Sequence, residues 1–551
     1  METKKKFESY EDFVENYELN IPENYNFSFD TLDELAREPE RLAMIHIDPE
    51  GGRRDYTFGY FKEQSCRLAN ALKDRGVQKG DRVMLILYRR VEFWIAMLAL
   101  HRLGAMPIPS PSLLTDKDIR ERVNYADITG LICEDSICGR VDKARKECPG
   151  LRTLVQVDGE LNQDWEAWDD VVQSGAADYP RPEGAPGGED PFLIFFSSGT
   201  TGMPKMVLHT YTYAYSHYTT AAYWHDLEPG DIHLTLSDTG WGKCVWGKFY
   251  GQWMAGAVIF VWDFRGKFVP AELLEMLAGH NVTTFCAPPT VYRFLVREDL
   301  TRYDLSNLRH CTTAGELLND SVFHAWKEAT GLSLYEGYGQ TETTLQVATF
   351  KFMEPKPSSI GRPVPGWDIV LLGQDGAPVP KGEEGEICIR LHTETGNNGV
   401  MGLFASYLDE SEKTAEVKAG GHYHTGDKVW EDEEGYFWFM GRTDDLIKSS
   451  GYRVGPFEVE SALVSHDAVV EAAVTGVPDP VRGQAIKATL VLAQGYAGTD
   501  ELTKELQDHV KKITAPYKYP RIIEYVAELP KTISGKIKRA EIRKADETKY
   551  N

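Results

Sequence analysis

The first third of the chain alternates amphipathic stretches with short apolar runs, and glycines separate them. Residues 58–73 place apolar side chains at helical spacing, and 82–88 (RVMLILY) form an apolar run short enough for a buried strand. A second helical stretch at 91–103 ends at Gly104, before a strand-like segment at 107–109. Such alternation is typical of a parallel sheet covered by helices, so the sequence predicts an α/β fold.

The charge is distributed unevenly along the chain and changes near Gly441. The formal net charge of the 551 residues is −24, but residues 442–551 sum to +1 and residues 1–441 to −25. Within 511–544 there are ten basic and three acidic residues. A shift of this kind favours a separate small domain with its own task.

The composition excludes several classes of protein. With 42% hydrophobic and 11% aromatic residues the chain can bury a large core, which argues against a disordered or fibrous protein. A length of 551 residues leaves room for three or four folding units of about 150 residues each. A net charge of −24 repels nucleic acid, so we expect no nucleic-acid partner.

The cysteines and the apolar runs bear on the location of the protein. Eight cysteines are too sparse for a secreted disulfide scaffold, and no C-x-x-C pair suggests zinc or redox chemistry. Residues 1–10 are basic but lead into acidic residues with no apolar stretch, unlike a secretory signal. The longest apolar run, 94–100, is far below the roughly 20 residues that span a bilayer. We therefore expect a cytoplasmic protein without a membrane span.

The strongest chemical signal follows the apolar run 192–196 (FLIFF), which we expect to be a buried strand. Residues 197–205 (SSGTTGMPK) supply free backbone N–H groups, several hydroxyls and one ammonium, which suit a polyphosphate. The segment is not a Walker loop, because no Lys-Ser/Thr pair follows the spaced glycines. An ordinary Ser/Gly turn would explain any four of these residues, whereas nine in this order favour a phosphate site.

Two other patterns resemble functional motifs, a nucleotide loop and a metal site, but lack residues that these motifs need. Residues 242–248 have Walker spacing, but Phe249 replaces the hydroxyl that would hold Mg²⁺ and the intervening side chains are bulky, so we reject them as a nucleotide loop. His422 and His424 could suggest a metal site. Without further carboxylate or cysteine partners in their motif, they favour packing or solvent contact instead.

Several short motifs further along are suited to a nucleotide. They are Gly315-Glu316, Tyr338-Gly339-Gln340-Thr341-Glu342, Thr425-Gly426-Asp427 and residues 441–453 (GRTDDLIKSSGYR). Each alone is weak, since a Tyr-Gly turn with a helix-starting Thr and Glu is common at a helix N-terminus. Their order along the chain carries the signal.

In that order the chain resembles the adenylate-forming superfamily of acyl-CoA synthetases, firefly luciferases and peptide-synthetase adenylation domains. The resemblance is carried by SSGTTGMPK, TAGEL, YGQTE, HTGD, GRTDDLIKSSGYR and LPKTISGK and covers nearly the whole chain. SDTGW at 237–241, DPVRG at 479–483 and TAPYKYPR at 514–521 are most similar to medium-chain acyl-CoA synthetases. The resemblance implies an α/β protein with a large N-terminal domain (1–441) of parallel-rich sheets covered by helices, a hinge (442–445) and a small mobile α+β C-terminal domain (446–551).

The resemblance also implies an AMP-forming reaction in which a carboxylic acid, ATP and coenzyme A give acyl-CoA, AMP and pyrophosphate, with Mg²⁺ as cofactor. Thr341 would contact the α-phosphate, Glu342 would bind Mg²⁺, and Asp427 and Arg442 would hold the ribose. An ordinary turn after Gly426 is the alternative for Asp427. The phosphate loop and adenine pocket would comprise Ser197, Ser198, Gly199, Thr200, Thr201, Gly202, Lys205, Gly315, Glu316, Leu317, Glu336, Gly337, Tyr338, Gly339 and Gln340.

The C-terminal domain would supply the adenylation lysine and the coenzyme A contacts. By resemblance the lysine is Lys536, whose ammonium would bridge the substrate carboxylate and the α-phosphate, and the domain would rotate about Asp444. The implied coenzyme A contacts are Ser450, Gly451, Arg453, Arg482 and Lys511. Without the motifs, solvated surface charge would explain these basic residues as well.

The acid is the least specified substrate. Residues 239–247 match the acyl-pocket region of the family, where Trp241 would line the carboxylate end, Trp246 could close the tunnel and Lys243 adds an unusual charge. We therefore expect a short- to medium-chain acid, with a branched one included; a core tryptophan and a solvent-directed lysine are the alternative. Two other functions stay open: transfer to a carrier-protein phosphopantetheine, and a non-catalytic nucleotide sensor. The oligomeric state is expected to be monomer or homodimer.

Overall fold

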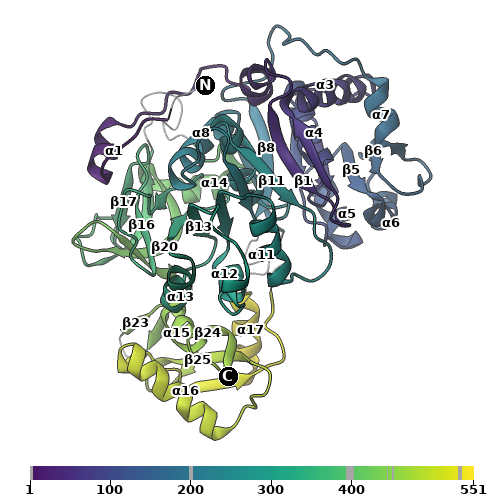
Figure 1. Cartoon of the computed structure of the whole chain (residues 1–551). Coiled ribbons are helices and arrows are strands. Elements are labelled where there is room, and N and C mark those ends of the chain that lie inside the picture. The colour runs from purple at the N-terminus through teal and green to yellow at the C-terminus, as the bar shows by residue number, and fades with distance from the viewer. Residues whose placement is uncertain are drawn as a thin grey trace.

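A computed structural model describes residues 4–197, 203–391, 402–443, 445–449, 452–531 and 537–550, apart from the side chains of Arg453 and Thr548. The chain forms a large N-terminal body and a small C-terminal unit beneath it (Figure 1). The helices of the large body are α1 (Tyr10–Asn16), α2 (Asp33–Leu35), α3 (Phe58–Asp74), α4 (Val91–Leu103), α5 (Asp116–Tyr125), α6 (Asp135–Ala144), α7 (Trp168–Ser174), α8 (Thr212–Thr219), α9 (Gly242–Gly247), α10 (Tyr250–Met254), α11 (Pro270–Gly279), α12 (Pro289–Leu295), α13 (Asp320–Thr330) and α14 (Ser411–Val417).

The predicted alternation near the N-terminus is confirmed. Helix α3 begins after Thr57, whose side chain accepts a hydrogen bond from the Tyr60 N–H, and α4 ends at Gly104, whose φ of 78° favours glycine. The neighbouring sheet is parallel throughout, in accord with the prediction. Its strands are, in spatial order, β4 (Met106–Pro109), β3 (Arg82–Ile86), β5 (Gly130–Glu134), β6 (Thr153–Val157) and β7 (Glu166–Ala167).

The largest sheet is parallel in one half and antiparallel in the other. Strands β1 and β10–β14 form the parallel half, with β2 antiparallel at its outer edge. The segment after β14 folds back as antiparallel strands. In spatial order the strands are β17 (Ile369–Leu372), β18 (Glu384–Arg390), β20 (His422–Glu431), β21 (Phe437–Arg442), β16 (Ser359–Pro363), β15 (Val347–Ala348), β14 (Leu334–Tyr338), β13 (His310–Ala314), β12 (Thr284–Ala287), β10 (Ile232–Thr235), β11 (Val258–Trp262), β1 (Leu42–Ile47) and β2 (Arg53–Thr57). The alternation of the first third gave no hint of the antiparallel half.

The predicted strand at 192–196 is confirmed, but it belongs to an antiparallel hairpin. Strand β8 (Pro191–Ser197) pairs with β9 (Lys205–Thr210), and β9 pairs with β19 (Ser406–Tyr407). Ser197 and Lys205 are directly opposite each other. The predicted phosphate loop therefore connects two paired strands, whereas a Walker loop leads from a strand into a helix.

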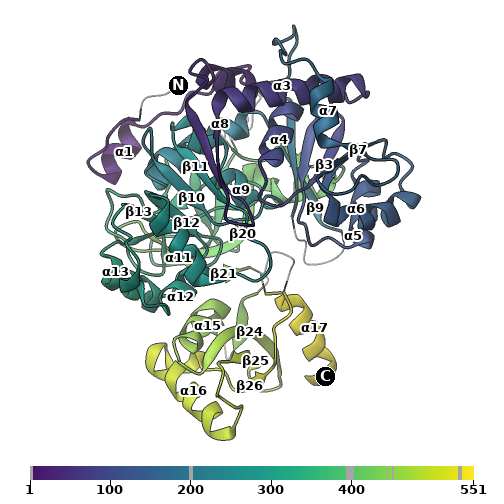
Figure 2. The ribbon, with the colours of Figure 1, turned by 45° about the vertical axis from the view of Figure 1, so that its right-hand side comes forward.

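The C-terminal unit has its own sheet and hydrophobic core. It joins the large body through Phe457, which packs against the apolar cluster around Leu317, and through Asn319, whose Nδ2 donates to the Ser461 carbonyl at 3.2 Å. Figure 2 shows the unit below the large sheet. Its elements are β22 (Ile447–Ser449), β23 (Tyr452–Val454), α15 (Pro456–Val464), β24 (Val469–Asp479), β25 (Gly483–Leu492), α16 (Asp500–Ile513), β26 (Ile522–Tyr525) and α17 (Arg539–Tyr550).

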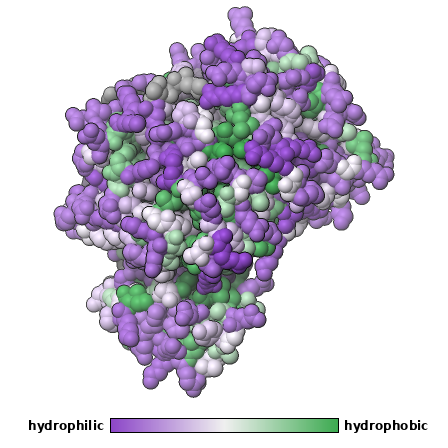
Figure 3. Space-filling model, viewed as in Figure 1, coloured by the Kyte–Doolittle hydropathy of each residue, from purple (hydrophilic) through white to green (hydrophobic). Residues whose placement is uncertain are grey.

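The surface is mostly hydrophilic. On the face seen in Figure 3, hydrophobic residues gather along the middle of the large body and where it adjoins the C-terminal unit. Among the described residues, no helix is both long and apolar enough to cross a membrane.

Candidate functional site

Two predicted walls of the adenine pocket meet at one edge of the large sheet. Strands β13 and β14 are parallel, and Ala314 is opposite Gly337. Gly315 follows β13 directly with a φ of 104°, a conformation that favours glycine. Because parallel strands end at the same edge, residues 315–317 and 336–338 lie beside each other, at the kind of edge where ligands bind in α/β proteins.

Glu336 is a buried carboxyl in this wall. Its Oε1 accepts a hydrogen bond from the Leu318 N–H at 3.2 Å, and its Oε2 has no partner among the described residues. Burial raises the pKa of Glu336 well above its usual range, which favours the neutral carboxyl. In its neutral form Glu336 could donate a hydrogen bond to a ligand. By contrast, Glu316 is exposed and accepts from the Thr290 hydroxyl at 2.6 Å.

Asp427 lies at the centre of a hydrogen-bond network that joins three of the predicted motifs. Its Oδ2 accepts from the Tyr338 hydroxyl and from Gln340 Nε2, both at 2.6 Å. Arg442 is opposite Asp427 in the β20–β21 pair, and its Nη1 is 3.5 Å from Asp427 Oδ1. The structure thus places YGQTE, HTGD and the start of GRTDD around one buried carboxylate.

Tyr423 is part of the same network, although it is not among the residues predicted from the sequence. Its hydroxyl donates to Gln340 Oε1 at 2.8 Å, while Gln340 Nε2 also donates to the Thr425 carbonyl at 2.8 Å. These contacts hold the Gln340 amide in one orientation, with its nitrogen toward Asp427. Tyr423 lies one residue before the HTGD motif, which is the only signal that could have pointed to it.

A second missed tyrosine links the phosphate loop to the predicted magnesium ligand. The Tyr407 hydroxyl donates to Glu342 Oε1 at 2.8 Å, and Lys205 Nζ is 3.4 Å from that hydroxyl and 4.5 Å from the ring centre. Burial lowers the pKa of Lys205 from its usual value. The Lys205 ammonium, the Tyr407 hydroxyl and the Glu342 carboxylate are therefore in contact in this order, next to the start of β9. No motif surrounds Tyr407.

Thr341 is positioned through its backbone by a buried histidine. Burial lowers the pKa of His209 to about 3, so the imidazole is neutral, and its Nε2 lies 2.8 Å from the Thr341 carbonyl. A neutral ring can only donate to a carbonyl, which assigns the proton to Nε2. The His209 ring stacks on Tyr213 with centres 3.8 Å apart. His209 was not predicted either, because the sequence does not distinguish a histidine that positions a site residue from an ordinary buried histidine.

Trp246 of the predicted acyl pocket lies against the YGQTE turn. A Cβ atom at Gly339 would be 2.3 Å from the Trp246 ring and 2.5 Å from the Thr344 carbonyl, so only glycine fits there. Lys243 Nζ donates to the Ala314 carbonyl at 2.9 Å, at the end of β13. Trp241, half-buried, precedes α9. Residues predicted for the acyl pocket therefore adjoin residues predicted for the adenine pocket.

The C-terminal candidates are only partly described. Ser449, the last residue of β22, pairs with Gly483, which brings Arg482 next to the end of β22. Arg482 Nη1 is 3.4 Å from Asp479. Lys511 is on α16, 2.8 Å from Asp508 and 4.3 Å from the centre of the Tyr519 ring. Outside the described residues lie Ser198, Gly199, Thr200, Thr201, Gly202, Asp444, Ser450, Gly451 and Lys536, and the Arg453 side chain is likewise undescribed.

Comparisons with known proteins show the family to which the chain belongs. The family model described as AMP-binding enzyme matches residues 32–396, and the model described as AMP-binding enzyme C-terminal domain matches residues 458–536. The chain is 40% identical to acyl-coenzyme A synthetase ACSM3, mitochondrial, of Homo sapiens over 99% of this chain and 93% of that protein. It is 42% identical to acyl-coenzyme A synthetase ACSM4, mitochondrial, of Mus musculus over 96% and 92%. Among solved structures, the anthranilate CoA ligase AuaEII in complex with anthranoyl-AMP matches with a TM-score of 0.85 and 29% identity, covering 96% and 98% of the chains.

Proposed function

Because the chain belongs to the family of AMP-binding enzymes, we propose that it activates a carboxylic acid with ATP and passes the acyl group to coenzyme A. It is an AMP-forming acyl-CoA synthetase. In the first half-reaction the carboxylate oxygen attacks the α-phosphorus and pyrophosphate leaves. In the second, the sulfur of coenzyme A attacks the acyl carbon, AMP leaves and the thiol proton is released.

The single observation that carries this proposal is the network around Asp427. A buried carboxylate accepts hydrogen bonds from Tyr338 and Gln340 and faces Arg442, beside the edge formed by residues 315–317 and 336–338. An anionic acceptor in this position suits the two hydroxyls of a ribose, because charged acceptors make the stronger hydrogen bonds. The adjoining backbone edge suits a planar base.

The phosphate end is proposed to lie at Lys205 and Glu342. The Lys205 ammonium can attract the phosphates of ATP, and the Glu342 carboxylate is the type of ligand that Mg²⁺ prefers. Bound Mg²⁺ would neutralise phosphate charge during the reaction. Tyr407 fixes the Glu342 carboxylate by donating to one of its oxygens, which leaves the other to face the cation.

The function is tested by assaying a panel of carboxylic acids for AMP release that depends on coenzyme A. Release without coenzyme A dependence but with transfer to a carrier-protein phosphopantetheine would favour the alternative acceptor. Absence of acid-dependent ATP–pyrophosphate exchange would instead favour a nucleotide sensor. The coenzyme A contacts, the cytoplasmic location and the state as monomer or homodimer stay predictions.

The acyl pocket is proposed to be closed by Trp246. The indole lies against Gly339, and the ammonium of Lys243, three residues earlier on α9, donates to the Ala314 carbonyl. A short- to medium-chain acid, straight or branched, fits such a pocket best.

Replacement of Trp246 by alanine is expected to lengthen the accepted acid. Each additional buried methylene contributes about 0.8 kcal/mol, so kcat/KM for an acid two carbons longer should rise by about tenfold relative to the original substrate. The measurement is the chain-length profile of Trp246→Ala. Trp246→Phe, which keeps most of the volume, serves as control and should shift the profile less. An unchanged profile in Trp246→Ala would refute the blocking role.

The C-terminal unit is proposed to rotate about Asp444 between the half-reactions. The side chains and backbone on either side of this position contact different units. The Thr443 N–H donates to the Gly426 carbonyl at 2.8 Å, whereas the Asp445 carboxylate pairs with Arg543 of α17 and lies 3.8 Å from Arg539. The Asp445 N–H also donates to the Arg442 carbonyl at 3.1 Å, across the proposed hinge. If the two units rotate relative to each other, Asp444 lies where the backbone φ and ψ angles would have to change.

Asp444→Pro is therefore expected to lower the overall turnover by about tenfold or more, because proline fixes φ near −65° and holds one orientation of the unit. The rates of acyl-AMP formation and of thioester formation from supplied acyl-AMP are measured separately, and we expect one to fall far more than the other. Asp444→Ala, which leaves φ free, is the control. Two unchanged rates in Asp444→Pro would exclude the hinge.

A further inference from the structure

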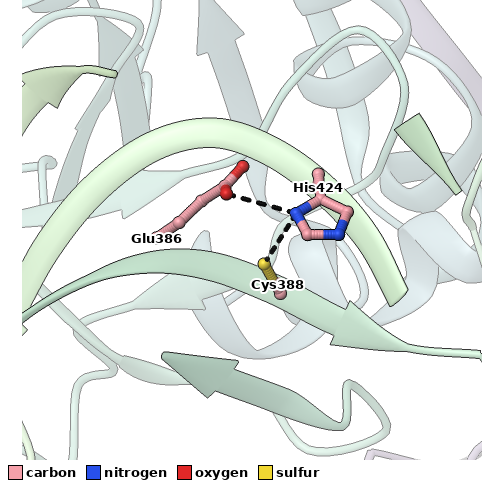
Figure 4. Close-up of side chains that lie close together, drawn as sticks. All are labelled: Glu386, Cys388 and His424. Carbon is pink, nitrogen blue, oxygen red and sulfur yellow. Dashed lines mark hydrogen bonds and ion pairs between the residues drawn. The ribbon is translucent and has the colours of Figure 1, made fainter. Parts of the chain in front are cut away.

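Three side chains with metal-binding atoms converge on neighbouring strands outside the nucleotide network. They are Glu386 and Cys388 of β18 and His424 of β20 (Figure 4). Cys388 and His424 are directly opposite each other in the antiparallel pair, and Glu386 lies two residues before Cys388 on the same face of the strand. Their ligand atoms all lie within 4.8 Å of one another.

In the sequence, neither a cysteine nor a carboxylate stands in the motif of His422 and His424 that could complete a metal site. The register of β18 and β20 supplies the carboxylate and the thiol that were absent from the motif, from positions 38 and 36 residues earlier. The expectation that His424 lacks such partners was wrong for this reason. The His422 imidazole instead faces the Gly420 carbonyl at 2.9 Å.

The contacts within the group are short enough for three ligands of one ion. His424 Nδ1 is 3.2 Å from Glu386 Oε2 and 3.4 Å from Cys388 Sγ. A neutral imidazole with its proton on Nε2 offers the Nδ1 lone pair, and the carboxylate oxygen and the sulfur offer theirs. One cation at this point could accept all three.

We propose that Glu386, Cys388 and His424 bind a divalent transition-metal ion of the Zn²⁺ class. One oxygen, one sulfur and one nitrogen form a mixed set that favours zinc or cobalt over Mg²⁺ and Ca²⁺, which select oxygen ligands. On binding, the Cys388 thiol gives its proton to solvent and the metal–sulfur bond forms. The Glu386 and His424 side chains are 21% and 32% exposed, so water can take the fourth position of a tetrahedral site.

The proposed site is connected to the turn that carries Asp427. Glu386 Oε1 accepts from the Gly426 N–H at 2.8 Å, while Oε2 faces His424. The carboxylate can therefore hold the turn with one oxygen and the metal with the other. A bound ion would therefore fix the Glu386 carboxylate and, through it, the backbone of Gly426, just before the proposed ribose ligand Asp427. Groups that hydrogen-bond to a metal ligand are commonly held in place in this way.

The test is a titration of the full-length, metal-stripped protein with Co²⁺, a spectroscopic substitute for zinc. We expect one Co²⁺ per chain, a thiolate-to-cobalt charge-transfer band in the near ultraviolet, and displacement by Zn²⁺. The band should vanish in Cys388→Ala, and Glu386→Gln and His424→Asn should each weaken binding by about tenfold or more. The readout needs neither ATP nor acid, so it is independent of the proposed ligase reaction.

Two control variants test whether the Co²⁺ band comes from the proposed site and not from other cysteines or histidines. Cys138→Ala removes another buried cysteine, whose sulfur is 3.6 Å from Cys133, and His324→Ala removes an exposed histidine. Both should bind Co²⁺ like the unchanged protein. A band that survives Cys388→Ala, a band lost in Cys138→Ala, or no stoichiometric binding would overturn the proposal. If Cys388→Ala does not fold, as judged by circular dichroism, unchanged affinity in both Glu386→Gln and His424→Asn would overturn it as well.

Discussion

Lys536→Ala is expected to abolish acyl-AMP formation while leaving thioester formation from supplied acyl-AMP largely intact. In the proposed mechanism the ammonium neutralises charge that develops between the carboxylate and the α-phosphate, and loss of one such electrostatic contact costs roughly 10²–10³-fold in rate. The second half-reaction starts from a bond already formed and does not need this charge. The two rates are measured separately, by acid-dependent ATP–pyrophosphate exchange and by thioester formation.

Lys538 offers a matched control for this experiment. It lies two residues away, also in the basic segment, and its ammonium pairs with Glu541 at 2.7 Å. Lys538→Ala should leave both rates within about twofold, as expected for a surface ion pair of at most about 1 kcal/mol. Equal losses of both half-reactions in Lys536→Ala would contradict the assignment of the adenylation lysine.

Asp427→Ala is expected to raise the KM for ATP by roughly 100-fold. Hydrogen bonds to a charged group are worth about 1.5–3 kcal/mol, and the loss of both ribose contacts corresponds to about two powers of ten. The alanine also removes the acceptor for Tyr338 and Gln340. The measurement is the ATP dependence of acid-dependent pyrophosphate exchange.

A second substrate separates ribose binding from general damage. The unchanged protein should use ATP much better than 2′,3′-dideoxy-ATP, whereas Asp427→Ala should use the two nucleotides about equally. The reason is that the carboxylate and the ribose hydroxyls form one contact, so removing the second partner costs little once the first is gone. Asp427→Asn keeps an acceptor for Tyr338 and is the milder companion. Glu431→Gln, on the same strand and paired with Lys381 at 3.0 Å, is the control. Full discrimination in a folded Asp427→Ala would rule out the ribose role.

Local signals predicted individual elements well. Helix α4 has the predicted bounds, 91–103, because an apolar helical stretch meets a glycine that adopts positive φ. The strand at 192–196 was also predicted, but its antiparallel partner was not, since apolarity says nothing about direction. Strand β14 includes Tyr338, the first residue of the YGQTE motif, because Gly337 and Tyr338 pair with β15.

The motifs predicted which residues belong to the site but not how they are connected. Tyr338 and Gln340 were selected in one motif and Asp427 in another, whereas the hydrogen bonds from the first two to the Asp427 carboxylate depend on how β14 and β20 lie in the sheet. Tyr407 and His209 have no motif, and only the fold places them beside Glu342 and Thr341.

By itself, the sequence determined the order of the motifs, the family, the charge difference near Gly441 and the helices with clear stop signals, because these depend on residue types at short spacing. The tertiary structure alone decided the long-range pairs: Ser197 opposite Lys205, Asp427 opposite Arg442, and Glu386 and Cys388 beside His424. The physical reason is strand register, since a shift of one residue turns every side chain to the other face of the sheet. That register is set by packing across the whole domain.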